Sequence, residues 1–208
     1  MIAVSDAPLT TPCPQFILNM VLELLRSETG PVHRRLEDRL DIQRRLTSVE
    51  DYRHLLGRFY GLYSGLERRG VTHGDGLRRT KSNLLKEDLR SLGLSPGAIG
   101  DLPHYDWPVF SAAAGLGAFY VVEGSTLGGQ FISRMAGEQL GGAGVGPQSG
   151  ARFFHGYGDQ TRAMWQAARD WLESENMRLA EPEEVVKGAL RTFEAFEHWL
   201  CAEGGTRA

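Results

Sequence analysis

The sequence predicts an all-α protein that folds as a single-domain helical bundle. Apolar residues recur every three or four positions in several long segments, which is the helical period, and no useful stretch alternates apolar with polar residues. With 208 residues and 41% hydrophobic content, the chain can bury one large core without disulfides or a structural metal. We therefore expect about seven helices over residues 15–203, between tails at 1–14 and 204–208.

The first helix is predicted from a strongly apolar segment over residues 16–25. Pro31 then interrupts the pattern, and a proline inside a helix removes one backbone hydrogen bond and kinks the axis. Two outcomes remain open. Either a second helix begins after a cap at Thr29, or one bent helix continues to Leu40.

The next two helices are predicted by a capping signal and by helical spacing. Thr47 or Ser48 can cap the helix that follows, and its apolar stripe has the spacing i, i+3, i+4, i+7. A turn over 70–76 leads to a shorter amphipathic helix over 81–92, and the prolines and glycines of 91–108 predict a loop. The stripe consists of Tyr52, Leu55, Leu56, Phe59, Tyr63 and Leu66.

The central helix is predicted to follow Trp107 and to run to Leu140, although six glycines lie between positions 115 and 137. An interior glycine costs a helix about 1 kcal/mol relative to alanine, so bare backbone must be useful here. Two uses remain open: a flat, bulky molecule lies on the backbone, or another helix packs closely against it. One face carries Gly117, Val121, Gly124 and Gly128, bordered by Tyr120 and Phe131.

A flexible connector is expected over 141–150 and an aromatic turn over 153–158, and two further helices complete the chain. Asp159 or Thr161 is expected to cap the first of them. A proline and two acidic residues at 182–184 favour the N-terminus of the second, which is expected to run to Cys201.

Composition argues against several classes of protein. The net charge of −3 indicates no general affinity for nucleic acid or for a membrane surface. No apolar run reaches the length of about 18 residues that a membrane span needs. Cys13 and Cys201 lack metal-ligand spacing, and with no leader pattern at the N-terminus a cytoplasmic location is expected.

The six histidines form neither a zinc-protease motif nor the Glu-x-x-His pairs of a di-iron bundle. His33 is singled out because Glu37, one turn later, can accept the proton of its Nδ1 and leave Nε2 free for a metal. An ordinary packed or solvated role for His33, and an ion pair between Glu37 and Arg34, remain open.

Two separated stretches resemble the heme oxygenase family, and its bacterial branch in particular. Residues 25–37 are similar to the proximal-histidine helix, with the pattern Thr-x-x-x-His-x-x-Leu-Glu. Residues 120–129 are similar to the distal helix of the family. A later Phe-Phe-x-x-Tyr-Gly turn followed by a Trp-bearing helix is also similar, so the resemblance covers nearly the whole chain after the N-terminal tail.

The resemblance implies a heme oxygenase-like bundle that cleaves heme to biliverdin, carbon monoxide and ferrous iron. Heme b would be both substrate and cofactor, and dioxygen and an external electron donor would be required. His33 is the implied iron ligand, and Gly124, Ser125 and Gly128 are the implied catalytic residues on the distal side. The implied heme contacts are Arg26, Glu37, Tyr120, Gly129 and Arg134.

Within those roles, the two glycines would bring bare backbone against heme, while Ser125 would join the proton-delivery network. Animal members carry an aspartate where this chain has Ser125, so a different proton relay is implied. Arg26 and Tyr120 would hold the propionates, with Arg134 as a further candidate, and Glu37 would orient the histidine.

The implied partners are heme, a ferredoxin or reductase, and, as a further candidate, a bilin-accepting phytochrome. No nucleic-acid or membrane partner is expected. Two alternatives remain open. One is a non-catalytic heme carrier or sensor on the same fold, and the other is a structural protein that dimerises through its glycine face.

Overall fold

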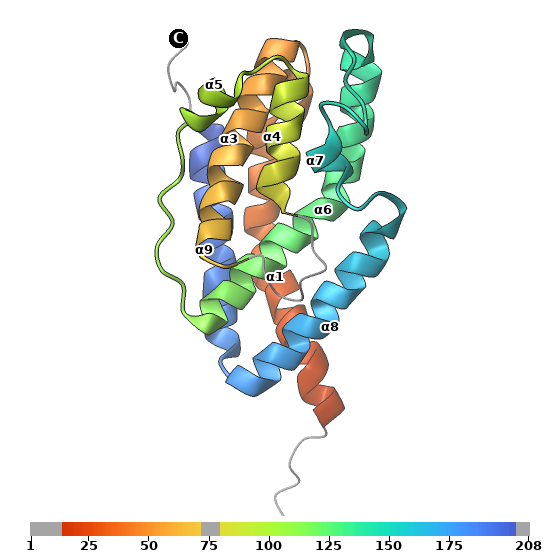
Figure 1. The fold of residues 1–208 in the computed structure, drawn as a ribbon. Coiled ribbons are helices and arrows are strands. Elements are labelled where there is room, and N and C mark those ends of the chain that lie inside the picture. The colour runs from red at the N-terminus through yellow and green to blue at the C-terminus, as the bar shows by residue number, and fades with distance from the viewer. Residues whose placement is uncertain (1–13, 72–79, 203–208) are drawn as a thin grey trace, which may run out of the picture.

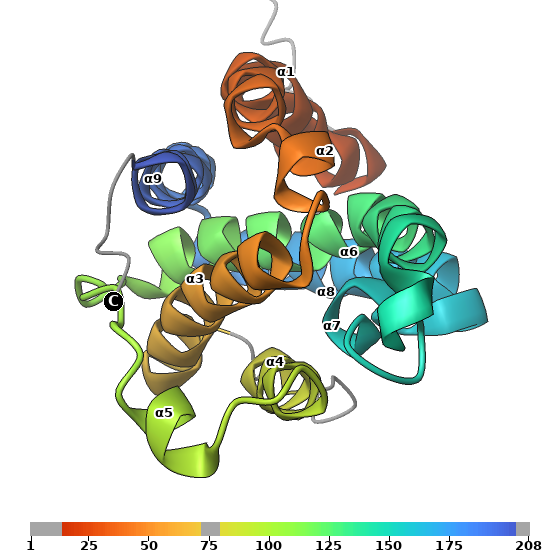
Figure 2. The same cartoon turned by 90° about the horizontal axis from the view of Figure 1, so that it is seen from above.

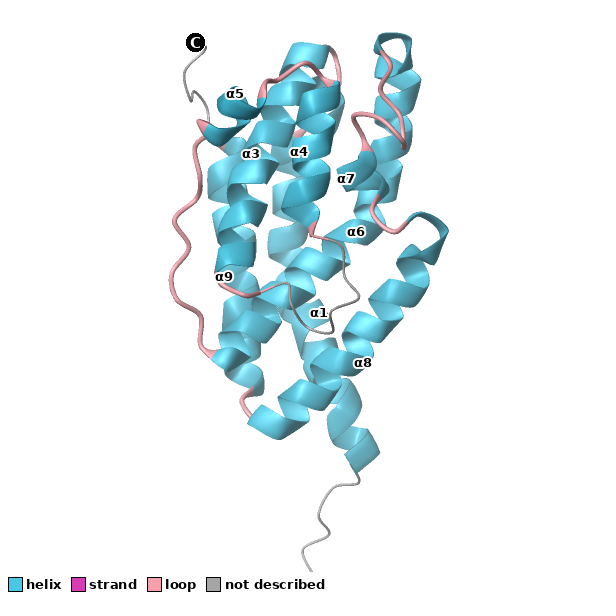
Figure 3. Cartoon of the chain, viewed as in Figure 1, coloured by secondary structure: helices cyan, strands magenta, loops and turns pink. Residues whose placement is uncertain are grey.

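The computed structural model describes residues 14–71 and 80–202, and within these ranges the chain is built from helices without a β-strand (Figures 1 and 3). The all-α prediction is therefore confirmed. The expected tails and most of the turn over 70–76 lie outside the described residues. The helices are α1 (Pro14–Leu40), α2 (Ile42–Arg45), α3 (Val49–Arg68), α4 (Lys81–Ser91), α5 (Pro96–Gly100), α6 (Ala112–Leu140), α7 (Arg152–His155), α8 (Thr161–Leu179) and α9 (Pro182–Cys201).

Helix α1 settles the question raised by Pro31, because the helix continues through the proline to Leu40. Thr29 does not cap a new helix; its hydroxyl donates to the carbonyl of Leu25 at 2.6 Å, one turn earlier. Consequently Thr29 and His33, four residues apart, lie on one face of one helix.

Helix α3 begins as predicted and forms the centre of the core. Ser48 is its N-cap and accepts a hydrogen bond from the backbone of Asp51 at 3.0 Å. All six residues of the predicted apolar stripe are buried. On the opposite edge of α3, any side chain at Gly61 or Gly65 would overlap the segment 103–107, so these glycines let that segment pass close to the helix.

Helix α6 crosses α9 at a contact between two glycines. A Cβ added to Gly117 would overlap the carbonyl of Val185, and one added to Gly188 would overlap the backbone of Ala114. Such a crossing brings two helix backbones closer than side chains allow. Figure 2 shows α6 running across the middle of the bundle, with α9 and α1 on one side and α3 on the other.

The predicted cap of α8 is wrong. The 3₁₀ turn Gly158–Gln160 leads directly into the helix, and Gln160 at the N-cap position makes no side-chain cap. Thr161 is the first helical residue, and its hydroxyl donates to the carbonyl of Gly158 at 2.7 Å while it accepts from Gln130 of α6 at 2.8 Å. The hydroxyl therefore joins α8 to α6, a use that the local sequence does not reveal.

An ion-pair cluster joins α1 to α9. Arg35 and Arg39 each donate to the carboxylate of Glu197 at 2.7 Å, and Glu197 is buried while both arginines are half-exposed. Hydrogen bonds from the two guanidinium groups lower the pKa of Glu197 from 4.5 to about 2. The ionised carboxylate therefore favours the folded state.

We expect this cluster to make the protein acid-labile. Since the folded-state pKa lies below the unfolded value, the stabilisation is complete above pH 4.5 and is lost as the pH falls toward 2. In Glu197→Gln, the free energy of unfolding at neutral pH should fall by about 2 kcal/mol, and its decline between those pH values should become shallower. Urea titrations across this pH range measure both effects. Glu194→Gln, an exposed carboxylate one turn away, is the control and should retain the wild-type slope.

Candidate functional site

The site predicted from the sequence begins where α1 meets α6. The hydroxyl of Tyr120 on α6 lies near Thr29 on α1, and Arg169 of α8 and Arg26 of α1 lie near enough to act on its pKa. Burial raises the pKa of Tyr120, whereas the hydroxyl of Thr29 and the two positive charges act in the opposite direction. Three helices therefore contribute polar and cationic groups to this point.

Beyond this contact, α1 and α6 separate. Figure 1 shows both helices rising from the crossing toward their C-terminal ends, and Figure 2 shows those ends well apart. His33 lies one turn after Thr29 on α1, and Gly124 lies one turn after Tyr120 on α6. Positions i and i+4 share a helix face. His33 therefore lies on the same face of α1 as Thr29, and Gly124 lies on the same face of α6 as Tyr120.

His33 presents a half-exposed imidazole, with 50% of its side chain accessible. The ring stands edge-on to Phe193 of α9 with 5.4 Å between the ring centroids. The expectation that Nδ1 faces Glu37 is wrong for this conformation: Nε2 is the nitrogen near Glu37, 3.6 Å from Oε1. Both side chains are exposed, and in this orientation of the ring Nε2 is the nitrogen that lies near the carboxylate.

On α6, the face that follows Tyr120 is open. A Cβ added to Gly128 would have no atom within 4 Å, and the flanking Leu127 and Phe131 are 42% and 59% exposed. Gly124 is half-buried, with the ring of Trp165 3.5 Å from the position of its Cβ. We call Gly124, Leu127, Gly128 and Phe131 the open face of α6. It combines bare backbone with exposed apolar side chains, which favours the binding of a flat apolar ligand.

The glycines of α6 have different surroundings, and close helix packing, one of the two uses left open by the sequence, is observed. Gly117 allows the close crossing with α9, and a Cβ at Gly129 would lie 2.8 Å from the carbonyl of Phe154 on α7. Close packing therefore accounts for the missing side chain at Gly129, which was expected to contact a cofactor. Gly128 instead faces open space. Gly124 is intermediate, because the Trp165 ring is at ordinary van der Waals distance from its Cβ position.

Ser125 takes part in a short chain of hydroxyl groups. Its Oγ donates to the carbonyl of Val122 at 2.8 Å and lies 2.9 Å from the hydroxyl of Tyr63 on α3. Ser125 is exposed, whereas the side chain of Tyr63 is fully buried. Burial raises the pKa of Tyr63, so its hydroxyl stays protonated and donates to Ser125.

Sequence reasoning missed three residues of this region. Tyr63 belongs to the predicted apolar stripe, and the sequence assigns no functional role to Trp165, which is half-buried against Tyr120 at 5.5 Å between ring centroids. Arg169 of α8 carried no signal at all. Among the predicted cationic residues, Arg26 and Arg134 are exposed, and no ion pair within the described ranges engages either of them.

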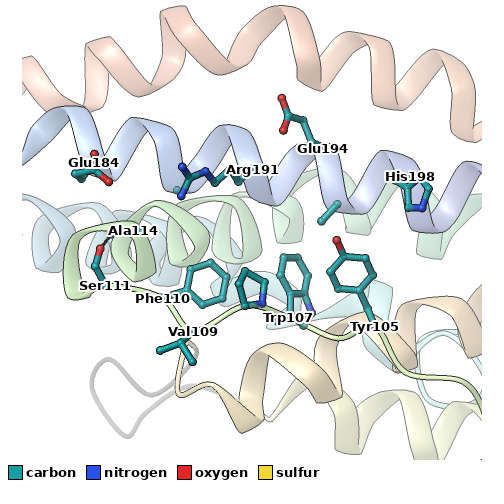
Figure 4. Close-up of a pocket in the computed structure, with 13 residues that line it drawn as sticks. Tyr105, Trp107, Val109, Phe110, Ser111, Ala114, Glu184, Arg191, Glu194 and His198 are labelled. Carbon is teal, nitrogen blue, oxygen red and sulfur yellow. Dashed lines mark hydrogen bonds between the residues drawn. The ribbon is translucent and has the colours of Figure 1, made fainter.

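The cavity shown in Figure 4 is separate from these residues. It has a volume of about 610 Å³ and lies between the segment 105–111 and α9. Its aromatic floor belongs to the packing of that segment, since the indole of Trp107 donates to the carbonyl of Leu62 at 2.9 Å. No residue predicted from the sequence to act in the site lines it, and we assign it to packing.

Two kinds of feature are absent from the described part of the chain. No cluster of three or more His, Cys, Asp or Glu side chains within residues 14–71 and 80–202 is arranged to hold a metal ion. Over the same ranges, no helix combines the length and the apolar character that crossing a lipid bilayer requires.

Comparison with known proteins identifies relatives by sequence and by fold. A family model described as Heme oxygenase matches residues 107–202. A protein named Heme oxygenase from Xanthomonas campestris pv. campestris (strain 8004) is 31% identical over 161 residues, which cover 74% of this chain and 92% of that protein.

Solved structures of similar fold are also heme oxygenases. The enzyme from Neisseria meningitidis, determined with NO and CO bound, superimposes with a TM-score of 0.69 at 20% identity, covering 86% of this chain and 89% of that one. The enzyme from Leptospira interrogans gives a TM-score of 0.69 at 18% identity, covering 87% of this chain and 98% of that one. At these identities the likeness establishes the fold.

Proposed function

We propose, from the premise that this chain belongs to the heme oxygenase family, that it is an enzyme that degrades heme. Heme would bind between His33 of α1 and the open face of α6. The observation that carries this placement is the bare backbone at Gly128, with open space where a side chain would stand and with exposed Leu127 and Phe131 beside it. A planar macrocycle would cover these apolar groups on binding.

The proximal side would be supplied by His33, whose half-exposed imidazole can reach a ligand without displacing core residues. A neutral imidazole nitrogen is a common protein ligand for heme iron. Turning the ring would direct Nε2 away from Glu37 and bring Nδ1 toward the carboxylate, which would then fix the orientation of the ring. Glu37 therefore keeps the orienting role expected for it.

The propionates of heme would lie near the cationic groups around Tyr120. Arg26 and Arg169 both act on that tyrosine, and a guanidinium group can bind a carboxylate through two parallel hydrogen bonds. Arg134, exposed on α6, is a further candidate.

On the distal side, the bare backbone at Gly128 would lie against the ligand, and Gly124, where the ring of Trp165 lies 3.5 Å from the Cβ position, would border it. Ser125 would relay protons, and the support for this role is that its Oγ lies 2.9 Å from the buried hydroxyl of Tyr63. Heme supplies the iron that activates dioxygen. The protein would hold the ring in place, keep water from its apolar edge and deliver protons at Ser125.

Electrons would come from outside the chain. We propose a ferredoxin or a reductase as the donor, with dioxygen as the oxidant and with biliverdin, carbon monoxide and ferrous iron as the products. A bilin-accepting phytochrome would be one destination for the product.

The test is aerobic turnover of a one-to-one hemin complex. On addition of a reductant in air, the Soret band should decay and a bilin should appear, identified by its absorption and mass. A stable hemin complex that is reduced without bleaching would instead indicate a heme carrier or sensor. Failure to bind hemin would contradict both functions and favour a purely structural role for the open face.

A further inference from the structure

The residue immediately before Gly124 is a carboxylate held inside the protein. Glu123 is 1% exposed, and each of its carboxylate oxygens faces a different partner. Nζ of Lys81 lies 3.1 Å from Oε1, and the hydroxyl of Tyr157 donates to Oε2 at 3.2 Å. Lys81 is itself only 5% exposed, so both charges of this ion pair are withdrawn from water.

These three residues come from three parts of the chain. Lys81 is the first residue of α4, Glu123 belongs to α6, and Tyr157 follows α7. The ammonium group of Lys81 also lies over the ring of Tyr157, 5.1 Å from its centroid. Removing one partner of a buried ion pair leaves an uncompensated charge and is strongly destabilising, so this cluster constrains how the three segments meet.

The cluster lies beside the weakest part of α6. Residues 124–129 include three glycines, which lower the intrinsic stability of a helix, and the open face gives this segment no covering element at Gly128. Ser125, two residues after Glu123, is bonded to Tyr63, and the charge of Glu123 adds to the effect of burial in raising the pKa of Tyr63.

We propose that Lys81, Glu123 and Tyr157 are positioning residues that hold the glycine segment of α6, and with it the hydroxyl of Ser125, in place for heme. This inference rests on the proposed function, because heme is the ligand that the ordered glycine segment would contact. None of the three residues lies on the open face; they act through the backbone of α6 and through Ser125.

A merely structural ion pair would stabilise the whole protein without a special effect on α6. The structure offers a matched control for that possibility. Glu67 of α3 accepts hydrogen bonds from the backbone N–H of Ser82, at 2.9 Å, and from its hydroxyl, so it also fixes the start of α4. Glu67→Gln therefore perturbs a neighbouring carboxylate that holds the same end of α4 and, among the described residues, forms no hydrogen bond or ion pair with α6.

Hydrogen–deuterium exchange of the ligand-free full chain tests the proposal. In Lys81→Met, amides in a peptide over residues 119–131 should exchange about tenfold faster than in the wild type, whereas Lys81→Arg should retain most of the protection. Glu67→Gln should leave this peptide unchanged. Equal acceleration across all helices in Lys81→Met, or none in 119–131, would overturn the proposal. If Lys81→Met does not fold, Tyr157→Phe, which removes only a hydroxyl, provides the same comparison.

The heme complex provides a second measurement. With carbon monoxide bound to the ferrous complex as a probe, Glu123→Gln should shift the C–O stretching frequency more than Glu67→Gln, because the charge of Glu123 acts more strongly on Tyr63, the partner of Ser125. An unchanged frequency in Glu123→Gln would contradict the effect on Ser125. Failure of the wild type to bind hemin would count against the proposed function alone, because the exchange experiment requires no heme.

Discussion

Replacing His33 by alanine is expected to lower hemin turnover by about 100-fold or more, because the iron would lose its proximal ligand. The Soret and visible bands of the hemin complex should shift, and added imidazole should restore part of the wild-type spectrum by occupying the vacated space. Since the side chain is half-exposed and, among the described residues, its ring packs only against the ring of Phe193, the ligand-free protein should lose less than about 1 kcal/mol of stability. Absorption spectra, turnover and thermal unfolding measure these effects.

His54→Ala is the control for this experiment, since His54 is exposed on α3 and away from both helices of the site. Its hemin spectrum and turnover should match those of the wild type. A His33→Ala protein with an unaltered Soret band would show that another group binds the iron, and the placement of heme beside α1 would then be wrong.

Two glycine substitutions on α6 are expected to have opposite effects on the ligand-free protein. In Gly117→Ala, the new methyl group would overlap the carbonyl of Val185, so α6 and α9 must move apart. Overpacking of this kind should reduce the free energy of unfolding by about 3 kcal/mol, and the unfolding temperature should fall by about 8 °C for a chain of this size.

In Gly128→Ala, the methyl group meets no atom within 4 Å, and alanine is the better helix former. The ligand-free protein should therefore gain up to about 1 kcal/mol. The same methyl group would project from the open face, so hemin affinity or turnover should fall. Thermal unfolding with and without hemin, run on both variants, measures the contrast. A Gly128→Ala protein that binds and cleaves heme like the wild type would remove the open face from the proposal.

Much of the fold could be predicted from periodicity and capping. The stripe from Tyr52 to Leu66 is buried, and Ser48 caps α3, because both features depend on residues close in sequence. The route of the chain at Pro31 could not be decided, since proline permits a kinked helix as well as a helix end. At Thr161, a hydrogen bond from Gln130 on another helix determined the use of the hydroxyl, and local rules for caps contain no such information.

Only part of the candidate site could be predicted, because several of its contacts depend on how the helices pack together. The unusual glycines of α6 indicated that bare backbone has a use, but spacing alone could not tell Gly117, which packs on α9, from Gly128, which faces open space. Tyr63 looked like any aromatic residue of a core stripe, and its bond to Ser125 depends on how α3 packs beside α6. Partners that meet only through tertiary packing leave no periodic signal in the sequence.

The cluster formed by Arg35, Arg39 and Glu197 has a consequence for biosynthesis. Glu197 is 162 residues from Arg35 and 158 residues from Arg39. The ribosome therefore releases α1, which bears His33, long before it synthesises α9, which binds α1 through this cluster. Until then, α1 lacks α9, the helix against which it packs most extensively, and its apolar side depends on transient protection from aggregation. A nascent chain stalled before position 197 would accordingly lack the carboxylate that binds Arg35 and Arg39 of α1, so under the proposed function heme would bind only after translation.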